Sequence, residues 1–426
     1  MRFQQLQDWL EWQESCHPRE VELGLERVGS VASAMAISLN HCQVITVAGT
    51  NGKGSCVATL NALLLSAGYR VGCYTSPHFL HYNERVMLNG LPVDDATLMH
   101  SFQRIDDARA ATPLTYFEFG TLAALDIFQR SHLDVAVLEV GLGGRLDAVN
   151  IIDADIAIAT SIAIDHQDWL GLDREQIGRE KAGIFRAGKP AISAGFNPPA
   201  SLRTVAQECG ADFYQAGEDF QFENGCWSGT NISGQSIECV NLPEPQLPKE
   251  SVAAAIQAIH LLPLATANID FACVNTVQLP GRFQQIKING KPLILDVAHN
   301  PAAAKYLAKR LQAQRCEGRT FALISVMQDK DLDGIVAALT AEIDAWFVAD
   351  QPNNDRAMPS NQITTVLSQH NINKFEVGKD IQQAYQRVLS LMEEGDRLLV
   401  FGSFFTVAEV LMLQGDTAKF TNEGNS

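Results

Sequence analysis

The sequence predicts two α/β domains, the first built on a doubly wound, mostly parallel sheet and the second smaller. The chain has 426 residues, more than a single hydrophobic core usually serves. Apolar, strand-like runs alternate with helical patterns from residue 43 to residue 195, and this alternation is typical of parallel sheets. A second alternation follows a turn-rich segment, so we expect domains at 1–275 and 283–426, joined by a linker at 276–282.

The composition is ordinary for a soluble globular protein, with 46% hydrophobic and 19% charged residues. A net charge of −17 argues against affinity for nucleic acid or anionic membranes, so we expect neither as a partner. Nine scattered cysteines without a Cys-x-x-Cys pair fit a reducing cytosol better than a disulfide framework or a zinc site. Residues 1–15 lack the pattern of a signal peptide, and we therefore expect a cytoplasmic protein.

The first strand and helix of the series, within 43–67, enclose a glycine-rich turn: Gly49, Thr50, Asn51, Gly52, Lys53, Gly54 and Ser55. Its glycines allow successive N–H groups to converge, and the following helix adds the positive end of its dipole. Lys53 adds a full charge, and Ser55 adds a hydroxyl that could reach a metal. We interpret the turn as a cradle for nucleotide phosphates, although only two residues separate Gly49 from Gly52, where the usual spacing is about four.

The following strands end in polar residues. Ser76 follows the second strand of the series, Glu139 lies near the end of the third, and His166 follows the fourth. Ligands gather at the carboxyl ends of strands in an open α/β sheet, and a carboxylate beside a glycine-rich turn suits Mg²⁺ bound with phosphate. Taken singly, each residue has an ordinary alternative: a turn cap, a turn residue and an exposed histidine. These strands are expected at 70–75, 134–140 and 155–160.

A capping-box-like start at 173–176 predicts a helix to about residue 186. Lys181 lies in its middle, and from the residues alone a helix lysine is a solvated charge. From 211 to 250, short alternating runs with Asn-Gly and Ser-Gly turns indicate small antiparallel strands. An apolar helix at 251–262 follows them.

The second domain again places polar residues at strand ends. Asp296 and His299 precede Asn300-Pro301, which form an N-cap and first-turn pair for the next helix. Ser403 follows the last clear strand. Two such halves joined by a short hinge predict a cleft that closes on its substrates. The strands of this domain are expected at 293–298, 321–326, 345–349 and 397–401.

Eight ordered motifs lie between residues 49 and 404: GTNGKGS, TSPH followed by YNERV, EVGLGGRLDA, DH-x-x-WLG, GREKAGIF, LPGRFQ, DVAHNP and FGSF. Together they resemble the folate-glutamate ligases of the Mur ligase superfamily, and especially their bacterial bifunctional type. The resemblance implies a Mur-ligase-like P-loop ATPase domain that also binds the pterin, followed by a Rossmann-like glutamate-ligase domain. It implies ATP-dependent addition of L-glutamate to dihydropteroate and to the γ-carboxylate of reduced folates, through an acyl phosphate.

The resemblance also implies cofactors and catalytic residues. ATP and Mg²⁺ are expected, with two metal ions, K⁺ is a further candidate, and the protein is expected to be a monomer. Lys53 would act at the transferring end of the phosphates. Lys181 resembles a lysine that the family carries as a carbamate, N6-carboxylysine, which would support a second metal. The family's magnesium ligands are matched by Ser76, Glu139 and His166, so Lys53, Lys181 and His166 are the expected catalytic residues.

Substrate contacts follow from the same resemblance. Arg282 and Asp296 match ATP contacts in the second domain, and His299 and Ser403 are candidates on the glutamate side. Ser251 stands where the family usually has an Asn that contacts ATP, and Phe405 replaces a His of the FGSFHT pattern. The pterin contacts are matched by Glu22, Leu23, Gly24, Leu25, Thr115, Tyr116, Phe117, Glu118, Leu146, Asp147 and Ala148.

Three alternatives stay open. An enzyme restricted to folate glutamylation would carry nearly the same motifs. A Mur-type ligase for cell-wall precursors would need a uridine-nucleotide domain, yet only 42 residues precede the first strand. A nucleotide-dependent switch protein would need neither metal ligands nor an acceptor site across a hinge.

Overall fold

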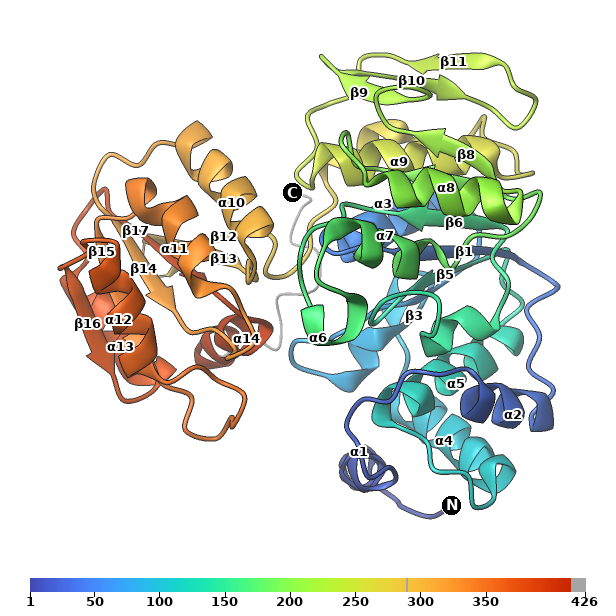
Figure 1. Cartoon of the computed structure of the whole chain (residues 1–426), viewed down its shortest axis with the longest axis horizontal. Helices are drawn as coiled ribbons and strands as arrows, with labels where there is room; N and C mark the ends of the chain where they lie inside the picture. Colours follow the sequence, from blue (N-terminus) through green and yellow to red (C-terminus); the bar gives the residue numbers. More distant parts are fainter. Residues whose placement is uncertain (289, 415–426) are drawn as a thin grey trace. The chain divides into compact units, whose positions relative to one another are not determined.

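A computed structural model of the chain describes residues 1–288 and 290–414. The chain divides into two compact units, Met1–Val277 and Gln278–Ser426, which are described separately (Figure 1). The end of the predicted second domain, residues 415–426, lies outside the described residues. Among the helices that the structure describes, none is long and apolar enough to cross a membrane.

The first unit is built on an eight-stranded sheet in the order β4-β3-β2-β5-β1-β6-β7-β8. The six strands from β2 to β8 pair in parallel, and β3 and β4 add an antiparallel edge. Buried runs such as QVITVA favour strands because their side chains lie inside on both faces. The strands are β1 (Gln43–Ala48), β2 (Val71–Tyr74), β3 (Val86–Leu88), β4 (Leu91–Pro92), β5 (Val135–Glu139), β6 (Ile156–Ala159), β7 (Pro190–Ser193) and β8 (Asp212–Gln215).

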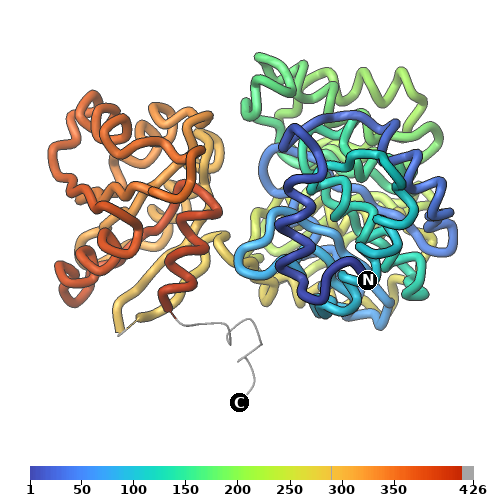
Figure 2. The backbone as a smooth tube through the Cα atoms, turned by 90° about the horizontal axis from the view of Figure 1, so that it is seen from below, coloured from blue at the N-terminus to red at the C-terminus, as the bar shows by residue number. Residues whose placement is uncertain are grey.

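Helices cover both faces of this sheet, which is therefore doubly wound as predicted. The phosphate-loop helix α3 (Lys53–Ser66) packs with α9 (Lys249–Leu261) against one face. The other face carries two apolar clusters. One lies under α1, α2, α4 and α5, and the other lies under α7 and α8. Figures 1 and 2 show α1 beside α4. These helices are α1 (Leu6–Ser15), α2 (Glu26–Ala34), α4 (Asp95–Arg109), α5 (Tyr116–Gln129), α7 (Arg174–Ala182) and α8 (Ala200–Cys209), with the short α6 (Gln167–Leu170), η1 (Tyr82–Arg85), η2 (Ala148–Ile151) and η3 (Phe271–Asn275).

The expectation of antiparallel strands throughout 211–250 was partly wrong. Asp212–Gln215 forms β8, a parallel edge strand of the main sheet, paired with β7. The small antiparallel sheet comprises only β9 (Gln221–Glu223), β10 (Cys226–Thr230) and β11 (Ser236–Cys239). The short run at 212–215 does not alternate cleanly in burial, so local pattern could not distinguish a parallel edge strand from a hairpin strand.

The second unit contains a six-stranded sheet in the order β12-β13-β17-β14-β15-β16. Only β12 is antiparallel to its neighbour. The two α/β sheets confirm the predicted fold class. The strands are β12 (Gln284–Ile288), β13 (Lys291–Asp296), β14 (Thr320–Ile324), β15 (Ala345–Ala349), β16 (Phe375–Gly378) and β17 (Arg397–Phe401). The helices are α10 (Pro301–Ala313), α11 (Leu332–Leu339), η4 (Thr340–Glu342), α12 (Ser360–Gln369), α13 (Ile381–Leu391) and α14 (Phe404–Leu413).

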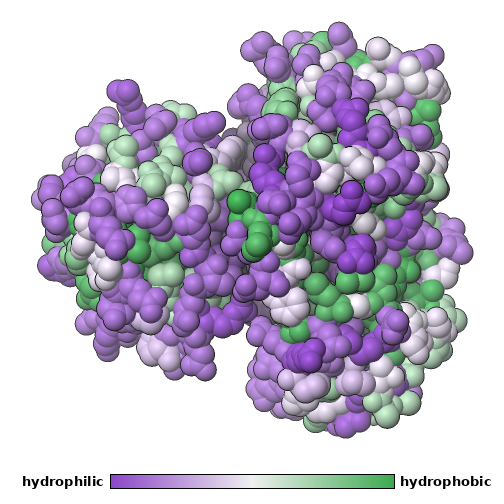
Figure 3. All heavy atoms as spheres, in the orientation of Figure 1, coloured by the Kyte–Doolittle hydropathy of each residue, from purple (hydrophilic) through white to green (hydrophobic). Residues whose placement is uncertain are grey.

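Most large apolar side chains are buried, and the face seen in Figure 3 is mainly hydrophilic with scattered hydrophobic residues. Three exposed apolar residues lie in or beside the short helix α6: Trp169 is part of it, and Ile164 and Leu172 lie on either side. All nine cysteines are free thiols, which agrees with the scattered pattern in the sequence.

Candidate active site

The phosphate loop follows β1 and depends on two glycines. Gly49 has φ 151° and Gly52 has φ 93°, in the region that favours glycine. A Cβ on Gly49 would lie 1.7 Å from Oγ1 of Thr160, and a Cβ on Gly52 would lie 2.6 Å from Oγ of Ser251. The loop therefore packs closely against the end of β6 and the first turn of α9, and there is no room for a side chain at either glycine position.

Ser251 lies inside α9, whereas the sequence analysis placed it at the start of the helix. Its hydroxyl donates to the carbonyl of Gly52 over 3.2 Å. The residue that departs from the family's pattern therefore touches the phosphate loop itself.

The segment that leads to His166 is hydrogen-bonded to the same loop. The Thr50 N–H donates to the carbonyl of Ser161 over 2.8 Å, and the Ser161 hydroxyl donates to the carbonyl of Asn51 over 3.0 Å. The Thr50 hydroxyl also exchanges two 3.1 Å hydrogen bonds with the backbone of Ala163. These contacts hold the loop after β6 beside the phosphate loop.

Two lysines converge on one carbonyl oxygen of the loop. Lys53 Nζ donates to Gly49 O over 3.1 Å, and Lys181 Nζ donates to the same oxygen over 2.9 Å. Lys181 is only 4% exposed, so the solvated charge that its helix position suggests is wrong. Burial, followed by the nearby charge of Lys53, lowers the pKa of Lys181 to about 7. A substantial fraction of this amine is therefore neutral at neutral pH.

Ser76, Glu139 and Ser55 supply oxygen atoms near the ends of β1, β2 and β5. Glu139 is buried, lies opposite Val47 in the sheet and accepts a 3.3 Å hydrogen bond from the Ser76 N–H. Among the described residues, the buried hydroxyl of Ser55 has no hydrogen-bond partner. Oxygen donors are the ligands that Mg²⁺ prefers, so these residues fit a magnesium ion bound with phosphate.

The backbone of His166 lies at the same edge of the sheet, in the segment that follows β6. It has φ 51° and ψ 44°, immediately before α6, and its N–H donates to Oδ1 of Asp165 over 2.9 Å. Its Nε2 lies 4.0 Å from that carboxylate oxygen, and its side chain is 39% exposed. Within 1–288 and 290–414, no three His, Cys, Asp or Glu side chains form a metal-binding group.

The three predicted pterin-contact stretches come together. The Gly24 N–H donates to the carbonyl of Leu146 over 3.1 Å, which joins the first stretch to the third. Arg27 joins the first stretch to the second, because its guanidinium contacts Glu22 and donates to Oε1 of Glu118 over 3.1 Å. Glu118 also closes a capping box with Thr115 at the start of α5. Leu23, Leu25, Tyr116, Phe117, Asp147 and Ala148 complete these stretches.

Asp147 stabilises the turn that separates Glu139 from the third stretch. Its carboxylate accepts hydrogen bonds from the N–H groups of Leu142 and Val149, over 2.9 and 3.0 Å. Burial nevertheless raises the pKa of Asp147 to about 6, against the lowering effect of these hydrogen bonds. The ring of Phe117 lies close over Gly141, where a Cβ would approach it to 2.5 Å.

In the second unit, the predicted residues gather at the carboxyl ends of β13 and β17. Asp296 accepts hydrogen bonds from the N–H groups of Phe283 and Ala298, both over 2.8 Å, and burial raises its pKa. Asp296 is the register partner of Phe401, the last residue of the neighbouring strand β17. Ser403 comes two residues after that strand end and caps α14. The Arg282 guanidinium lies 5.1 Å from the Phe404 ring centroid, and His299 Nδ1 lies 2.8 Å from the carbonyl of Val297.

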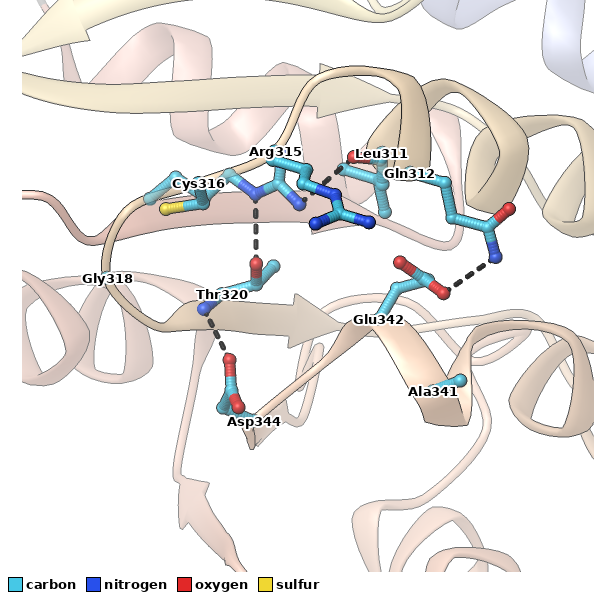
Figure 4. A pocket seen from close by; sticks show the side chains of 10 residues that line it. Leu311, Gln312, Arg315, Cys316, Gly318, Thr320, Ala341, Glu342 and Asp344 are labelled. Carbon is cyan, nitrogen blue, oxygen red and sulfur yellow. Dashed lines mark hydrogen bonds between the residues drawn. The ribbon is translucent and has the colours of Figure 1, made fainter.

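A pocket of about 550 Å³ in the second unit lies away from these residues (Figure 4). Its residues Thr320 and Arg397 begin β14 and β17, so it opens at the amino ends of the strands. Ligands of parallel α/β sheets gather at the opposite, carboxyl edge, where Asp296 and Ser403 lie. The pocket is lined by Leu311, Gln312, Arg315, Cys316, Gly318, Thr320, Ala341, Glu342, Asp344 and Arg397, none of which the sequence analysis selected.

Several contacting residues were missed from sequence. Thr160 and Ser161 contact the phosphate loop, and the charge of Asp165 acts on Lys181; only their position after a strand could have indicated them. In the second unit, Gln351 donates to the hydroxyls of Ser325 and Thr406, and the Thr406 hydroxyl contacts that of Ser403. Gln351 and Ser325 follow β15 and β14, so strand ends again carried the available signal, whereas Thr406 lies inside α14.

Comparisons with known proteins show the family to which the chain belongs. Residues 281–404 match the family described as Mur ligase, glutamate ligase domain. Dihydrofolate synthase/folylpolyglutamate synthase of Escherichia coli K12 is 42% identical over 409 residues, covering 95% of this chain and 94% of that protein.

Two solved structures superpose over nearly the whole chain. An Escherichia coli FolC structure in complex with DHPP and ADP has a TM-score of 0.89 and 41% identity, and covers 97% of this chain and 98% of that one. The bifunctional enzyme of Yersinia pestis, complexed with AMPPNP and a Mn ion, has a TM-score of 0.88 and 42% identity, with the same coverage. Full-length identity of this order, together with the glutamate ligase domain, means that the chain is an ATP-dependent ligase and belongs to the dihydrofolate synthase/folylpolyglutamate synthase family of the Mur ligases.

Proposed function

We propose that this protein joins L-glutamate to dihydropteroate and to the γ-carboxylate of reduced folates, at the expense of ATP. The observation that carries the proposal is the convergence of Lys53 and Lys181 on Gly49 O, together with the hydrogen bond from the Ser76 N–H to the buried Glu139. Phosphoryl transfer depends mainly on positioning and charge stabilisation, which such a cluster can supply. The substrate carboxylate becomes an acyl phosphate, the amino group of L-glutamate attacks it, and phosphate leaves as the amide forms.

The phosphate loop, Gly49–Ser55, would bind the nucleotide phosphates, with Lys53 at the transferring end. Ser251 would act indirectly, because its hydroxyl already binds the loop carbonyl of Gly52. Arg282 and Asp296 are the candidates for ATP contacts from the second unit, where burial and two backbone N–H donors fix the Asp296 carboxylate.

Ser76, Glu139 and His166 would hold Mg²⁺, which when bound would neutralise phosphate charge. The buried hydroxyl of Ser55, which has no hydrogen-bond partner in the part of the chain that the structure describes, supports a cation at this edge. Lys181 is proposed to carry a carbamate, because its lowered pKa leaves a nucleophilic amine that can add CO₂. A carbamate would turn this buried cation into an anion suited to a second magnesium ion, and K⁺ is a further candidate cofactor.

Glu22–Leu25, Thr115–Glu118 and Leu146–Ala148 are proposed to bind the pterin, and their mutual hydrogen bonds support a single surface. His299 and Ser403 are proposed to bind L-glutamate. These roles assign the phosphate loop and pterin binding to residues 1–275 and glutamate ligation to 283–426, with a linker at 276–282, while Arg282 and Asp296 add ATP contacts from outside residues 1–275. We further propose a cytoplasmic monomer.

The test is phosphate release in the presence of ATP and Mg²⁺. Release that requires both dihydropteroate and L-glutamate supports the ligase, whereas ATP turnover indifferent to both would reject it in favour of a nucleotide-dependent switch. An enzyme restricted to folate glutamylation would respond to a reduced folate and L-glutamate but not to dihydropteroate.

A further inference from the structure

A buried arginine lies between the proposed metal edge and the proposed pterin surface. Arg85 ends η1 and is 9% exposed. Its guanidinium carbon lies 5.3 Å from the Tyr82 ring centroid and 5.5 Å from that of Tyr116. Its Nε donates to Nδ1 of His78 over 2.9 Å. Aromatic faces and an imidazole nitrogen therefore surround a positively charged guanidinium.

Among residues 1–288 and 290–414, the charge of Arg85 has no anionic partner. Within the described residues no carboxylate lies in ion-pair distance of its guanidinium, and the Tyr74 hydroxyl is its other polar neighbour. The adjacent Glu84 is turned away, because its two carboxylate oxygens accept hydrogen bonds from the N–H groups of 79, 80 and 81, at 2.7 to 2.8 Å. Burying a charge without a counter-charge is costly, so this arrangement indicates a site completed by an anion.

Three other arginines of the same unit have carboxylate partners. Arg104 donates to Asp126, and Arg27 contacts both Glu22 and Glu118. Arg109 is the nearest match to Arg85, because it also lies over two aromatic rings, at 5.0 and 5.9 Å. Arg109 nevertheless has a carboxylate partner, Asp106, at 3.0 Å. Contact with two aromatic rings therefore does not prevent an arginine from having a carboxylate partner, and among the described residues Arg85 differs from Arg109 in having none.

The position of Arg85 restricts what the anion can be. Its carbonyl accepts a 2.9 Å hydrogen bond from the N–H of Thr75, the residue before Ser76. On its other side, Tyr116 begins one of the proposed pterin-contact stretches. A substrate that spans these two regions places next to Arg85 the part of the molecule beyond its heterocycle. In dihydropteroate that part is a benzoate, which carries one carboxylate.

We propose that the Arg85 guanidinium binds the carboxylate of the pterin-bearing substrate and selects for substrates that carry it. The inference rests on the proposed function and adds a specificity-determining residue to it. Arginine suits this role because its planar fork can donate two parallel hydrogen bonds to a carboxylate. Tyr82 and Tyr116, whose rings meet edge to face at 5.5 Å, hold the guanidinium in place.

The test compares two ligands on three proteins. The ligands are dihydropteroate and an analogue in which aniline replaces 4-aminobenzoate, so that only the carboxylate is missing. The proteins are wild type, Arg85→Gln and the matched control Arg109→Gln, with binding measured by calorimetry in the presence of ADP and Mg²⁺. We expect Arg85→Gln to weaken dihydropteroate roughly 10- to 100-fold, the usual effect of losing a charged hydrogen bond. Its affinity for the analogue should stay within about twofold of wild type.

The controls separate the possible failures. Arg109→Gln should leave the affinities for both ligands near wild type, and Arg85→Lys should restore part of the dihydropteroate affinity through its charge. Circular dichroism and retained ADP binding establish that the variants fold. Equal losses for the two ligands in Arg85→Gln, or no loss for dihydropteroate, would overturn the assignment while leaving the ligase intact. A wild-type protein that neither binds nor converts dihydropteroate would overturn the proposed function as well.

Discussion

Lys181 Nζ and the carbonyl oxygen of Gly49 lie 2.9 Å apart, although 132 positions separate the two residues in the chain. The Lys53 ammonium donates to the same oxygen, so two lysine side chains share one acceptor at the phosphate loop. This arrangement weakens the hold of Lys181 on its proton, since burial and the neighbouring charge both disfavour the ammonium form. The phosphate loop and α7 therefore interact in two ways: through the hydrogen bond from Lys181 to Gly49, and through the effect of the Lys53 charge on the pKa of Lys181.

Lys181→Ala should remove most ligase activity, by about 100- to 1000-fold in kcat, the range typical for the loss of one charge-stabilising group. Added bicarbonate or a short carboxylate should restore part of the activity, because either can replace the anion that the carbamate supplies. The measurement is phosphate release with and without the additive. Lys189→Ala is the matched control, since Lys189 pairs with Asp155 at a half-exposed site and should keep wild-type rates. Wild-type activity of Lys181→Ala would reject the carbamate role.

The pKa of Lys181 also predicts a pH dependence of stability. The folded-state pKa is about 7, against 10.5 for the exposed side chain. Between these two values the unfolded chain binds more protons, so this lysine makes the free energy of unfolding rise with pH. Below pH 7 both states are protonated and the destabilisation is at its greatest.

Lys181→Met removes that contribution. In buffer depleted of CO₂, the variant should exceed wild type in stability most at pH 6, and the difference should shrink as pH rises toward 10. Urea unfolding of both proteins across this range provides the measurement. A difference that does not change with pH would mean that Lys181 titrates alike in the folded and unfolded chains.

Gly52→Ala should impair nucleotide binding, because its Cβ would lie 2.6 Å from the Ser251 hydroxyl and its φ of 93° disfavours alanine. Ser251→Ala removes the clashing oxygen, and the next atom of residue 251 is 4.0 Å away. The double variant should therefore regain part of the lost ADP affinity, with backbone strain of about 1 kcal/mol remaining. Calorimetric titration of the two single variants and the double variant measures this coupling. Purely additive losses would show that the close approach to Ser251 does not limit the loop.

Arg27→Met should destabilise the first unit by about 3–5 kcal/mol, because it leaves the buried Glu118 carboxylate without its cation. It should also weaken dihydropteroate binding, since Arg27 joins two of the proposed pterin stretches. Arg19→Met is the control: Arg19 contacts the same Glu22 but is 72% exposed, so its loss should cost about 0.5 kcal/mol or less. Similar effects of the two substitutions on urea unfolding would contradict a structural role for Arg27.

The sequence predicted the elements whose signal is local. β15 and β17 occur at the predicted residues 345–349 and 397–401, because each is a short buried apolar run. β12 was missed, since Gln284–Ile288 alternates polar and apolar residues next to a turn and pairs only at the edge of the sheet. β16 was also missed, because Phe375–Gly378 is too short and too exposed to stand out.

The candidate site was predictable where strand ends mark it, and less so where distant segments meet. Ser76 and Glu139 were selected because each follows a strand. The burial of Lys181 could not be inferred from helical periodicity, because it depends on the glycine turn after β5. A Cβ on Gly144 would lie 2.8 Å from Lys181 O, so only glycine lets α7 approach this closely. Likewise, the pairing of Arg27 with Glu118 joins residues 91 positions apart.

The most direct test of the account is a mass-resolved product assay. The protein is incubated with ATP, Mg²⁺ and L-glutamate, together with dihydropteroate in one reaction and tetrahydrofolate in another. The account predicts that both substrates gain one glutamate residue, with one ADP and one phosphate released for each amide formed. ATP consumption without a glutamylated product from either substrate would contradict the account, and conversion of tetrahydrofolate alone would contradict its dihydropteroate half.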